Sequence, residues 1–294
     1  MELQIYINGK FFPQSKALIS VFDHGFLYGD GVFEGIRSYA GRVFRFEAHL
    51  ERLYKSAGRI ALKIPLSKEE LKEAVLVTLR KNNLKDAYIR LIVSRGTGDL
   101  GLDPRKCPKP TIVIITHKIS LYPESFYKQG LEIATLSTER NSPRALDPQI
   151  KSMNYLNNIL GKIEAIDKKV EEGIMFNRQG LVTECTGDNI FIVIQGKLLT
   201  PPLYLGVLEG ITRDIVMEIA RKFELPLAEE EIGREELYRV QECFLTGTAA
   251  EIIPVVKIDD RMIGDGQPGK TTLKMIEEFH KITRREGGEI YVKK

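Results

Sequence analysis

The chain has 294 residues, of which 43% are hydrophobic and 28% are charged, and it contains no low-complexity run. Such a composition is typical of folded globular proteins and argues against disorder. The formal net charge is only +3 and basic residues alternate with acidic ones, so no basic stripe indicates a nucleic-acid partner. No apolar run is long enough for a helix that spans a membrane, so we expect no membrane partner either.

The first fourteen residues alternate apolar and polar side chains around Asn8-Gly9, a dipeptide that favours a two-residue hairpin turn. They lack the uninterrupted apolar core of a signal peptide. The three cysteines (Cys107, Cys185 and Cys243) form no CxxC pair and the four histidines are scattered, which predicts neither a disulfide framework nor a metal site. A cytoplasmic location is the interpretation that follows.

Residues 23–37 combine four glycines with several large aromatic side chains. Glycine lets the backbone approach a ligand closely, and Tyr28 and Phe33 have the size and character of walls around an apolar pocket. A glycine-rich turn with aromatic core residues is the alternative interpretation.

Two helices are expected next, at residues 48–57 and 66–81. The second begins at Ser67, and Glu70 stands three residues later, which is the spacing of a capping box. Within the first helix, nothing in the local sequence distinguishes Arg52 from a surface arginine.

Residues 87–95 and 111–116 have the composition of strands. The segment between them, 96–101, matches the GxGxxG pattern of dinucleotide-binding loops. We reject that interpretation because a helix must open on the last glycine, whereas three prolines follow within ten residues. A glycine-rich loop is predicted instead.

The length of the chain favours two domains. The segment from about residue 120 to residue 130 is rich in turn formers and aromatic side chains, as connections between domains often are. We therefore predict a smaller N-terminal domain at 1–119, a connection at 120–129 and a larger C-terminal domain at 130–294.

Lys151 stands at a junction, because turn residues precede it and a helix is expected from about residue 156. Five apolar residues recur at helical spacing and predict the buried face of that helix: Leu156, Ile159, Leu160, Ile163 and Ile166. A lysine beside apolar neighbours is partly desolvated, which favours the neutral amine that acts as a nucleophile or base. Most of the 43 basic residues are nevertheless expected to be solvated, so position alone does not make Lys151 catalytic.

Three stretches of the second half have the character of ligand sites. Glu184 precedes an apolar strand expected at 190–194, and a buried acid needs a positive partner such as an arginine or a protonated heterocycle. Residues 208–214 open a helix with Thr212 as its expected N-cap; helix starts attract phosphate, although an ordinary capped helix is the commoner outcome. Residues 243–252 predict two strands joined by a turn of small residues, which leaves backbone amides open to a ligand.

Six separated motifs, taken together, resemble one known family. They are FEGIR at 33–37, Arg52, the stretch around Lys151, ECTGDNIF at 184–191, LEGITRD at 208–214 and TGTAAE at 246–251. In this order, and nearly from end to end of the chain, they are similar to the pyridoxal-phosphate aminotransferases of fold type IV, and most closely to the branched-chain amino acid aminotransferases. The resemblance implies a two-domain α+β fold, like that of D-amino acid aminotransferase, with pyridoxal 5′-phosphate in the cleft between the domains.

The resemblance also implies a role for each cofactor-binding residue. Lys151 matches the lysine that binds the cofactor covalently and moves the proton of the substrate α-carbon, and Glu184 matches the acid on the pyridine nitrogen. Tyr155 matches the tyrosine near the phenolic oxygen of the cofactor. The remaining cofactor-binding positions, most of them around the phosphate, correspond to Arg52, Leu208, Ile211, Thr212 and Thr248.

For the substrate, the resemblance assigns the α-carboxylate to Tyr88 and to the backbone amides of Thr248 and Ala249. Arg90 matches the arginine that meets the distal carboxylate of glutamate. The walls of the side-chain pocket correspond to Phe33, Tyr28 and Tyr122. The last two would come partly from the neighbouring subunit, which implies a homodimer and permits a higher homo-oligomer.

The reaction implied is transfer of the amine of leucine, isoleucine or valine to 2-oxoglutarate, a step of amino-acid biosynthesis. The same fold also occurs in D-amino acid aminotransferases and aminodeoxychorismate lyases. D-amino acid enzymes trap the substrate carboxylate with an arginine and a histidine, where this chain has Leu100 and Leu102. A purely cofactor-binding protein is a further alternative, which the presence of Lys151, Glu184 and Tyr155 together disfavours.

Overall fold

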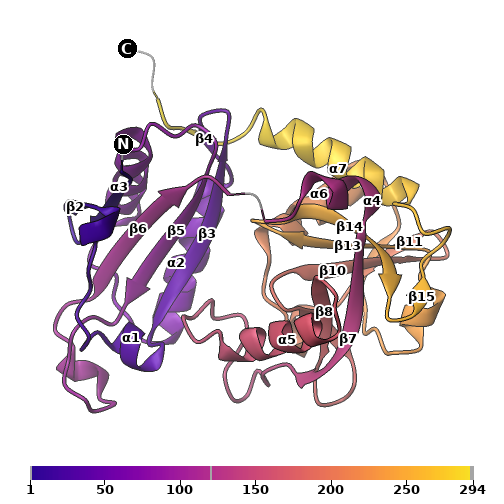
Figure 1. Cartoon of the computed structure of the whole chain (residues 1–294), viewed down its shortest axis with the longest axis horizontal. Coiled ribbons are helices and arrows are strands. Elements are labelled where there is room, and N and C mark those ends of the chain that lie inside the picture. The colour runs from indigo at the N-terminus through magenta and orange to yellow at the C-terminus, as the bar shows by residue number, and fades with distance from the viewer. Residues whose placement is uncertain (1, 120, 292–294) are drawn as a thin grey trace. The chain divides into compact units, whose positions relative to one another are not determined.

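The computed structural model describes residues 2–119 and 121–291, and these form two compact units (Figure 1). The first unit comprises residues 2–119, 150–155 and 283–291, and the second comprises residues 121–149 and 156–282. Each unit combines helices with one sheet, which confirms the expected α+β class. The short segment that carries Lys151 therefore packs with the first unit, although the chain has already entered the second unit before it.

The first unit is built on a sheet with the strand order β16-β4-β3-β5-β6-β1-β2 within the described residues. Its strands are β1 (Gln4–Ile7), β2 (Lys10–Pro13), β3 (Gly31–Tyr39), β4 (Arg42–Val43), β5 (Ala87–Ser94), β6 (Thr111–His117) and β16 (Gly288–Glu289). Its helices are α1 (His24–Tyr28), α2 (Phe46–Arg59) and α3 (Lys68–Lys81), with short 3-10 turns η1 (Gln14–Lys16) and η2 (Pro104–Lys106).

Several local predictions for this unit are confirmed. β1 and β2 pair as an antiparallel hairpin, and Asn8 and Gly9 between them both have positive φ, as a type I′ turn requires. The side chain of Ser67 accepts from the Glu70 N–H, and the Glu70 carboxylate accepts from the Ser67 N–H, which completes the capping box of α3. Residues 96–101 form a loop with no helix opening on it, since only η2 follows.

Helices α2 and α3 pack on the sheet through an apolar core that includes Val32, Ile36, Leu53, Leu79 and Leu91. Because side chains alternate across a strand, the residues directly before and after Val32, Ile36 and Leu91 point to the other face of the sheet.

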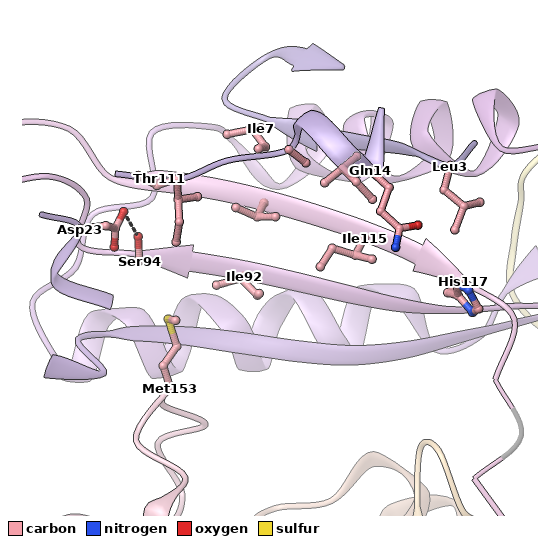
Figure 2. Close-up of a pocket in the computed structure, with 14 residues that line it drawn as sticks. Leu3, Ile7, Gln14, Asp23, Ile92, Ser94, Thr111, Ile115, His117 and Met153 are labelled. Atoms are coloured by element: carbon pink, nitrogen blue, oxygen red, sulfur yellow. Dashed lines mark hydrogen bonds between the residues drawn. The ribbon is translucent and has the colours of Figure 1, made fainter. Parts of the chain in front are cut away.

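That other face holds an apolar pocket of about 400 Å³ (Figure 2). Ile92 of β5 and Val113 and Ile115 of β6 line it, while their sequence neighbours lie in the core beneath α2 and α3. Met153, from the segment that carries Lys151, also lines the pocket, and Asp23 accepts a hydrogen bond from Ser94 at one end. The two faces of this sheet therefore differ, because one is covered by helices and the other holds an apolar pocket.

The second unit contains a larger sheet with the strand order β12-β11-β10-β13-β14-β7-β8-β9 and with β15 paired to β14, within the described residues. Its strands are β7 (Leu131–Glu139), β8 (Glu172–Phe176), β9 (Val182–Cys185), β10 (Asn189–Ile194), β11 (Lys197–Thr200), β12 (Leu227–Glu229), β13 (Glu242–Gly247), β14 (Glu251–Ile258) and β15 (Arg261–Met262). Its helices and 3-10 turns are α4 (Glu124–Gln129), α5 (Leu156–Asp167), α6 (Ile211–Lys222), α7 (Lys270–Thr283), η3 (Leu203–Leu205) and η4 (Glu236–Arg239).

Strands β10, β13 and β14 confirm the pattern predicted around residues 190–194 and 243–252. The predicted domain bounds of 1–119, 120–129 and 130–294 stay a prediction. Residue 120 of the expected connection lies outside the described residues, and Glu124–Gln129 form α4 within the second unit.

Helix α5 forms where it was predicted, but the prediction of its buried face was wrong. The five apolar side chains expected in the core are 49–60% exposed. The helix packs on β7 and β8 through Asn158, Gly161 and Ala165 instead. A Cβ atom added to Gly161 would lie only 3.2–3.4 Å from three neighbouring side chains, so the helix approaches the sheet too closely for large residues on that face. The apolar stripe of α5 consequently faces outward.

Across residues 2–119 and 121–291, no helix has the length and apolar character needed to cross a membrane. The same residues contain no group of three or more His, Cys, Asp or Glu side chains able to hold a metal ion.

Candidate active site

The backbone around Lys151 extends the sheet of the first unit. The Phe33 N–H donates to the Lys151 carbonyl (3.0 Å), and the Met153 N–H donates to the Gly31 carbonyl (2.8 Å). Residue Ser152 makes an isolated antiparallel bridge with Val32. On its other side, the Lys151 N–H donates to Ser56 Oγ of α2 at 3.2 Å. Lys151 is therefore fixed by its backbone, and its side chain is left to extend from the sheet.

Aromatic groups surround the Lys151 amine. Its Nζ atom donates to the Tyr155 hydroxyl at 3.1 Å and lies 4.8 Å from the ring centroid of Phe33. The rings of Phe33 and Tyr155 meet edge to face, with centroids 5.0 Å apart. The structure thus brings together three residues predicted for the site, and it places the amine beside a hydroxyl in largely apolar surroundings.

Tyr88 and Arg90 of β5 stand beside this group on the same face of the sheet. The Arg90 guanidinium lies 4.6 Å from the centroid of the Phe33 ring and 5.4 Å from that of Tyr88. Burial raises the pKa of Tyr88, which preserves its hydroxyl as a hydrogen-bond donor. A Cβ atom on Gly35 would lie 2.1 Å from the Tyr88 hydroxyl, so only glycine allows that hydroxyl its place.

Arg52 is buried, in contrast to the surface arginine that its local sequence suggested. Its Nε donates to Glu34 Oε1 (2.7 Å) and its Nη2 donates to Glu34 Oε2 (2.8 Å). Nδ1 of His49 shares Glu34 Oε2 at 2.8 Å. Glu34 itself, in the middle of β3, is completely buried.

Opposing effects set the pKa values of this buried group. Burial disfavours the ionised form of Glu34, but the charge and hydrogen bonds of Arg52 and the hydrogen bond from His49 outweigh burial and lower the pKa of Glu34 to about 2. Burial lowers the pKa of His49, and the nearby charges of Arg52 and Lys151 act in the same direction. Glu34 is therefore anionic and His49 neutral at neutral pH, so the Nδ1–H of His49 must donate to the carboxylate.

In the second unit, three donors hold the carboxylate of Glu184 on β9. Arg140 Nη2 donates to Oε1 at 2.5 Å, and the Leu208 N–H (3.0 Å) and Asn189 Nδ2 (3.1 Å) donate to Oε2. Arg140 is buried as well and also donates to Asn158 of α5 at 3.0 Å. The positive partner expected for a buried Glu184 is thus an arginine.

Asn189 connects Glu184 to the start of α6. Its Nδ2 also donates to the Leu208 carbonyl at 3.0 Å, and a Cβ atom on Gly210 would lie 1.9 Å from its Oδ1. The expected N-cap at Thr212 was wrong, because Ile211 is already helical and Gly210, with extended backbone angles, is the N-cap. Ile211 and Thr212 occupy the first turn, and among the described residues no side chain caps this helix.

Thr248 and Ala249 lie in the turn between β13 and β14, where both are half-buried. This turn follows Thr246, which pairs with Asn189 across the β10–β13 ladder. Leu208, the α6 start and this turn are thereby linked through Asn189 in the second unit.

Tyr28 and Tyr122, the tyrosines predicted to line the side-chain pocket, make different contacts from those of Phe33. Tyr28, at the end of α1, is 38% exposed, and its hydroxyl donates to the Leu100 carbonyl at 2.6 Å. Tyr122 is buried in the apolar core of the second unit, beside Phe126. The role of both side chains as pocket walls stays a prediction that depends on a second subunit.

Four residues that contact Arg52 or Glu184, directly or through Glu34, were not singled out from the sequence: Glu34, His49, Arg140 and Asn189. His49 and Arg52 are three residues apart and thus share one face of a helix, which is a signal that the sequence contains. Arg140 gives no such signal, because it lies 44 residues from Glu184 and only the fold makes them neighbours.

The chain matches the family Amino-transferase class IV over residues 31–258. A protein of Methanocaldococcus jannaschii described as a putative branched-chain-amino-acid aminotransferase is 50% identical to it over 289 residues, which cover 98% of this chain and 99% of that protein. Both comparisons extend over most of the chain, so the similarity includes both units.

Solved structures give the same picture. The crystal structure of the branched-chain amino acid aminotransferase of Escherichia coli has a TM-score of 0.93 at 33% identity and covers 96% of this chain and 95% of its own. The branched-chain amino acid aminotransferase of Thermobaculum terrenum, solved in its PLP form, has a TM-score of 0.86 at 30% identity, with coverage of 96% and 94%. The fold type expected from the sequence motifs is thereby confirmed.

The lowered pKa of Glu34 predicts a pH dependence of stability. A carboxyl group with a folded pKa of about 2 against an ordinary 4.5 stabilises the fold above pH 4.5, and this contribution is lost as the pH falls toward 2. Between pH 6 and pH 3 the free energy of unfolding should therefore fall by about 2 kcal/mol more in the unmodified protein than in Glu34→Gln. Urea unfolding at both pH values measures this difference. The exposed Glu69→Gln variant should follow the unmodified protein, and equal losses in Glu34→Gln would contradict the prediction.

Proposed function

The chain belongs to the class IV aminotransferases, within the group of branched-chain-amino-acid aminotransferases, and we propose that it transfers the amine of L-leucine, L-isoleucine or L-valine to 2-oxoglutarate. The observation that carries this proposal is the group around Lys151, where Tyr155, Phe33, Tyr88 and Arg90 meet on one sheet face. It combines an amine nucleophile, an apolar wall and a cation for a second carboxylate.

Enzymes of this class use pyridoxal 5′-phosphate, which binds amines covalently through its aldehyde carbon and withdraws electrons from the substrate α-carbon. The residues of both units fit this cofactor. Lys151 offers an amine for the aldehyde, and Glu184 offers a carboxylate for the pyridine nitrogen. The carboxylate is oriented by Arg140, Asn189 and the Leu208 N–H.

The phosphate group finds suitable partners in the start of α6 and in Arg52. A helix of twelve residues that begins without a side-chain cap presents its first N–H groups, those of Ile211 and Thr212, to an anion. Arg52 adds a guanidinium, the group best shaped for phosphate oxygens. Thr248 is the remaining proposed phosphate partner.

Lys151 serves in this proposal as both nucleophile and base. With the cofactor bound, its Nζ atom would take the proton from the substrate α-carbon and later return one. The Tyr155 hydroxyl, 3.1 Å from Nζ, orients the amine for this task. The backbone bonds of Lys151 keep the motion within its side chain.

Two kinds of side chain must fit the substrate pocket. Phe33 and Tyr88 give an apolar surface for a branched aliphatic group, and the Tyr88 hydroxyl with the amides of Thr248 and Ala249 receives the α-carboxylate. Arg90 has no carboxylate partner in the described parts of the chain and is assigned to the distal carboxylate of glutamate and 2-oxoglutarate.

Specificity for L-amino acids is supported by the two positions at which D-amino acid aminotransferases bind the substrate carboxylate. Leu100 and Leu102 occupy a loop of the first unit and are 67% and 79% exposed. Neither side chain can bind a carboxylate, so the charged trap of D-amino acid enzymes has no counterpart at these positions. A D-amino acid aminotransferase and an aminodeoxychorismate lyase remain the alternatives that the first experiment separates.

A homodimer is the proposed assembly. Contiguous exposed apolar surfaces mark interaction sites, and the described residues form two of them. One is the outward stripe of α5; the other, on the first unit, includes the pocket of Figure 2 and the exposed side chains of residues 18–28. A second copy would cover them and bring the exposed Tyr28 to a neighbouring site. The cytoplasmic location and the role in amino-acid biosynthesis stay predictions of the sequence.

The visible spectrum of the cofactor-loaded protein tests the reaction. L-leucine should remove the visible absorption of the bound cofactor, because the cofactor accepts the amine of L-leucine. D-alanine should leave that absorption unchanged. Loss with D-alanine alone would indicate the D-amino acid enzyme, and no change with either would favour the lyase. Lys151→Ala is the matched control and should turn over neither substrate.

Arg90→Met tests the dual use of the pocket. It removes the cation but keeps an apolar chain of similar length, so kcat/KM for L-glutamate should fall by about 100-fold while that for L-leucine changes by less than about threefold. Steady-state kinetics with both donors measure the two values. Equal losses for the two donors would refute the role of Arg90, and the exposed Arg105→Met variant should change neither value.

Charges placed on the α5 stripe test the assembly. Ile159→Arg combined with Ile163→Arg should weaken the dimer by about 100-fold or more, because the new charges would be buried in the contact. Sedimentation equilibrium at several protein concentrations measures the dissociation constant. Asp167→Arg, on the same helix but outside the stripe, should leave it unchanged. A dimer that survives the double variant would exclude α5 from the contact.

A further inference from the structure

Helix α2 carries a line of buried polar side chains through a face that is otherwise apolar. His49, Arg52 and Ser56 follow at spacings of three and four residues, so they lie on one side of the helix, and each is 8% exposed or less. Apolar side chains of the same helix pack around them in the core: Phe46, Leu50, Leu53 and Ala57. Buried polar groups destabilise a fold unless they are well bonded, so a line of three calls for an explanation.

Glu34 on β3 is the partner of the first two. Its carboxylate receives two parallel N–H bonds from one edge of the Arg52 guanidinium and a third bond from His49 Nδ1. Its sequence neighbours on the same face of the strand, Val32 and Ile36, are fully buried apolar residues. Two parallel bonds fix both the plane and the direction of a guanidinium, which a single bond does not.

The third member of the line holds the catalytic segment. Ser56 Oγ accepts the Lys151 N–H, and Phe33, the residue before Glu34, donates its N–H to the Lys151 carbonyl. The strand and helix that orient Arg52 are thus the same elements that fix Lys151. A displacement of either element would move both residues together.

We infer that Glu34 and His49 are positioning residues, which hold the Arg52 guanidinium in the orientation that binds the phosphate of the cofactor before the cofactor arrives. This inference rests on the proposed function, in which Arg52 is a phosphate partner. Glu34 uses two of the five N–H donors of the guanidinium, and the pair keeps the arginine buried and ordered without a ligand. Ordering a flexible arginine during binding would weaken affinity, and Glu34 removes that loss in advance.

The test compares two ligands that differ only in the phosphate. The full chain, freed of cofactor, is titrated with pyridoxal 5′-phosphate and separately with pyridoxal, and absorbance gives both dissociation constants. In Glu34→Gln, affinity for pyridoxal 5′-phosphate should fall by about tenfold or more, whereas affinity for pyridoxal should change by less than about twofold. A general loss of structure would weaken both ligands alike.

Arg52→Met tests whether Glu34 affects the affinity for the cofactor through Arg52. This substitution should also lower the affinity for pyridoxal 5′-phosphate selectively, and adding Glu34→Gln to it should cause no further loss, because the positioned group is gone. Glu34→Asp keeps the negative charge but shortens the reach to Arg52, so it should show the same selective loss in a protein that still buries a carboxylate at this position. It serves as the second variant should Glu34→Gln fold poorly.

Asp30→Asn is the matched control, since Asp30 also receives two guanidinium bonds, from Arg95, in the same unit (2.9 Å each). Asp30→Asn should leave unchanged the ratio of the affinity for pyridoxal 5′-phosphate to the affinity for pyridoxal. A ratio that stays constant or rises in Glu34→Gln and in Glu34→Asp would overturn the inference while the unmodified protein still bound both ligands. An unmodified protein that bound neither ligand would overturn the proposed function itself.

Discussion

The rest of the site depends on the pairing of residues 151–153 with the edge of β3. Two backbone hydrogen bonds, which together form the bridge between Val32 and Ser152, add this short segment to the sheet of the first unit. The pairing requires Gly31, because a Cβ atom there would lie 2.5 Å from Met153 Sδ and 2.7 Å from the Val93 carbonyl. Since the backbone of Lys151 is held by N–H and carbonyl groups, its amine can leave one partner for another while the main chain stays in place. A residue that must act both as nucleophile and as base needs such an attachment.

Each unit buries an ion pair at a residue of the proposed site, Glu34–Arg52 in the first and Arg140–Glu184 in the second. Buried ion pairs rarely add stability, because the cost of taking both charges out of water offsets their attraction, and apolar replacements are often as stable or more so. Stability alone therefore does not explain them. In both pairs one side chain is assigned to the cofactor, and the other side chain fixes the orientation of the first. We therefore interpret the buried pairs as a means of orienting the cofactor-binding side chain, which offsets the free energy of desolvation.

Local sequence was enough to predict helices α2, α3, α5 and α6, strands such as β5 and β6, the hairpin at Asn8-Gly9 and the capping box at Ser67, because each depends on residues a few positions apart. It was not enough for α5, since a period of apolar residues identifies a helix but not the face that meets the sheet. There the small side chains of Gly161 and Ala165 permitted the closer approach. Arg140 and Asn189 could not be predicted as partners of Glu184, because no local pattern encodes a contact that the topology of the sheet creates.

Arg90 differs from the other arginines near the site in what holds it. Arg52 and Arg140 donate to buried carboxylates, whereas Arg90 rests against the rings of Phe33 and Tyr88. A cation over an aromatic face gains only about 0.5–1 kcal/mol at an exposed position, much less than a two-bond pairing with a carboxylate. A ligand carboxylate can therefore draw Arg90 from the rings at little cost. When the ligand is aliphatic, the guanidinium stays on the rings, and its flat face leaves the wall of the pocket apolar. Substrates with and without a second charge can then share one pocket, because the cation is stored on an aromatic surface and not in a salt bridge that glutamate would have to break.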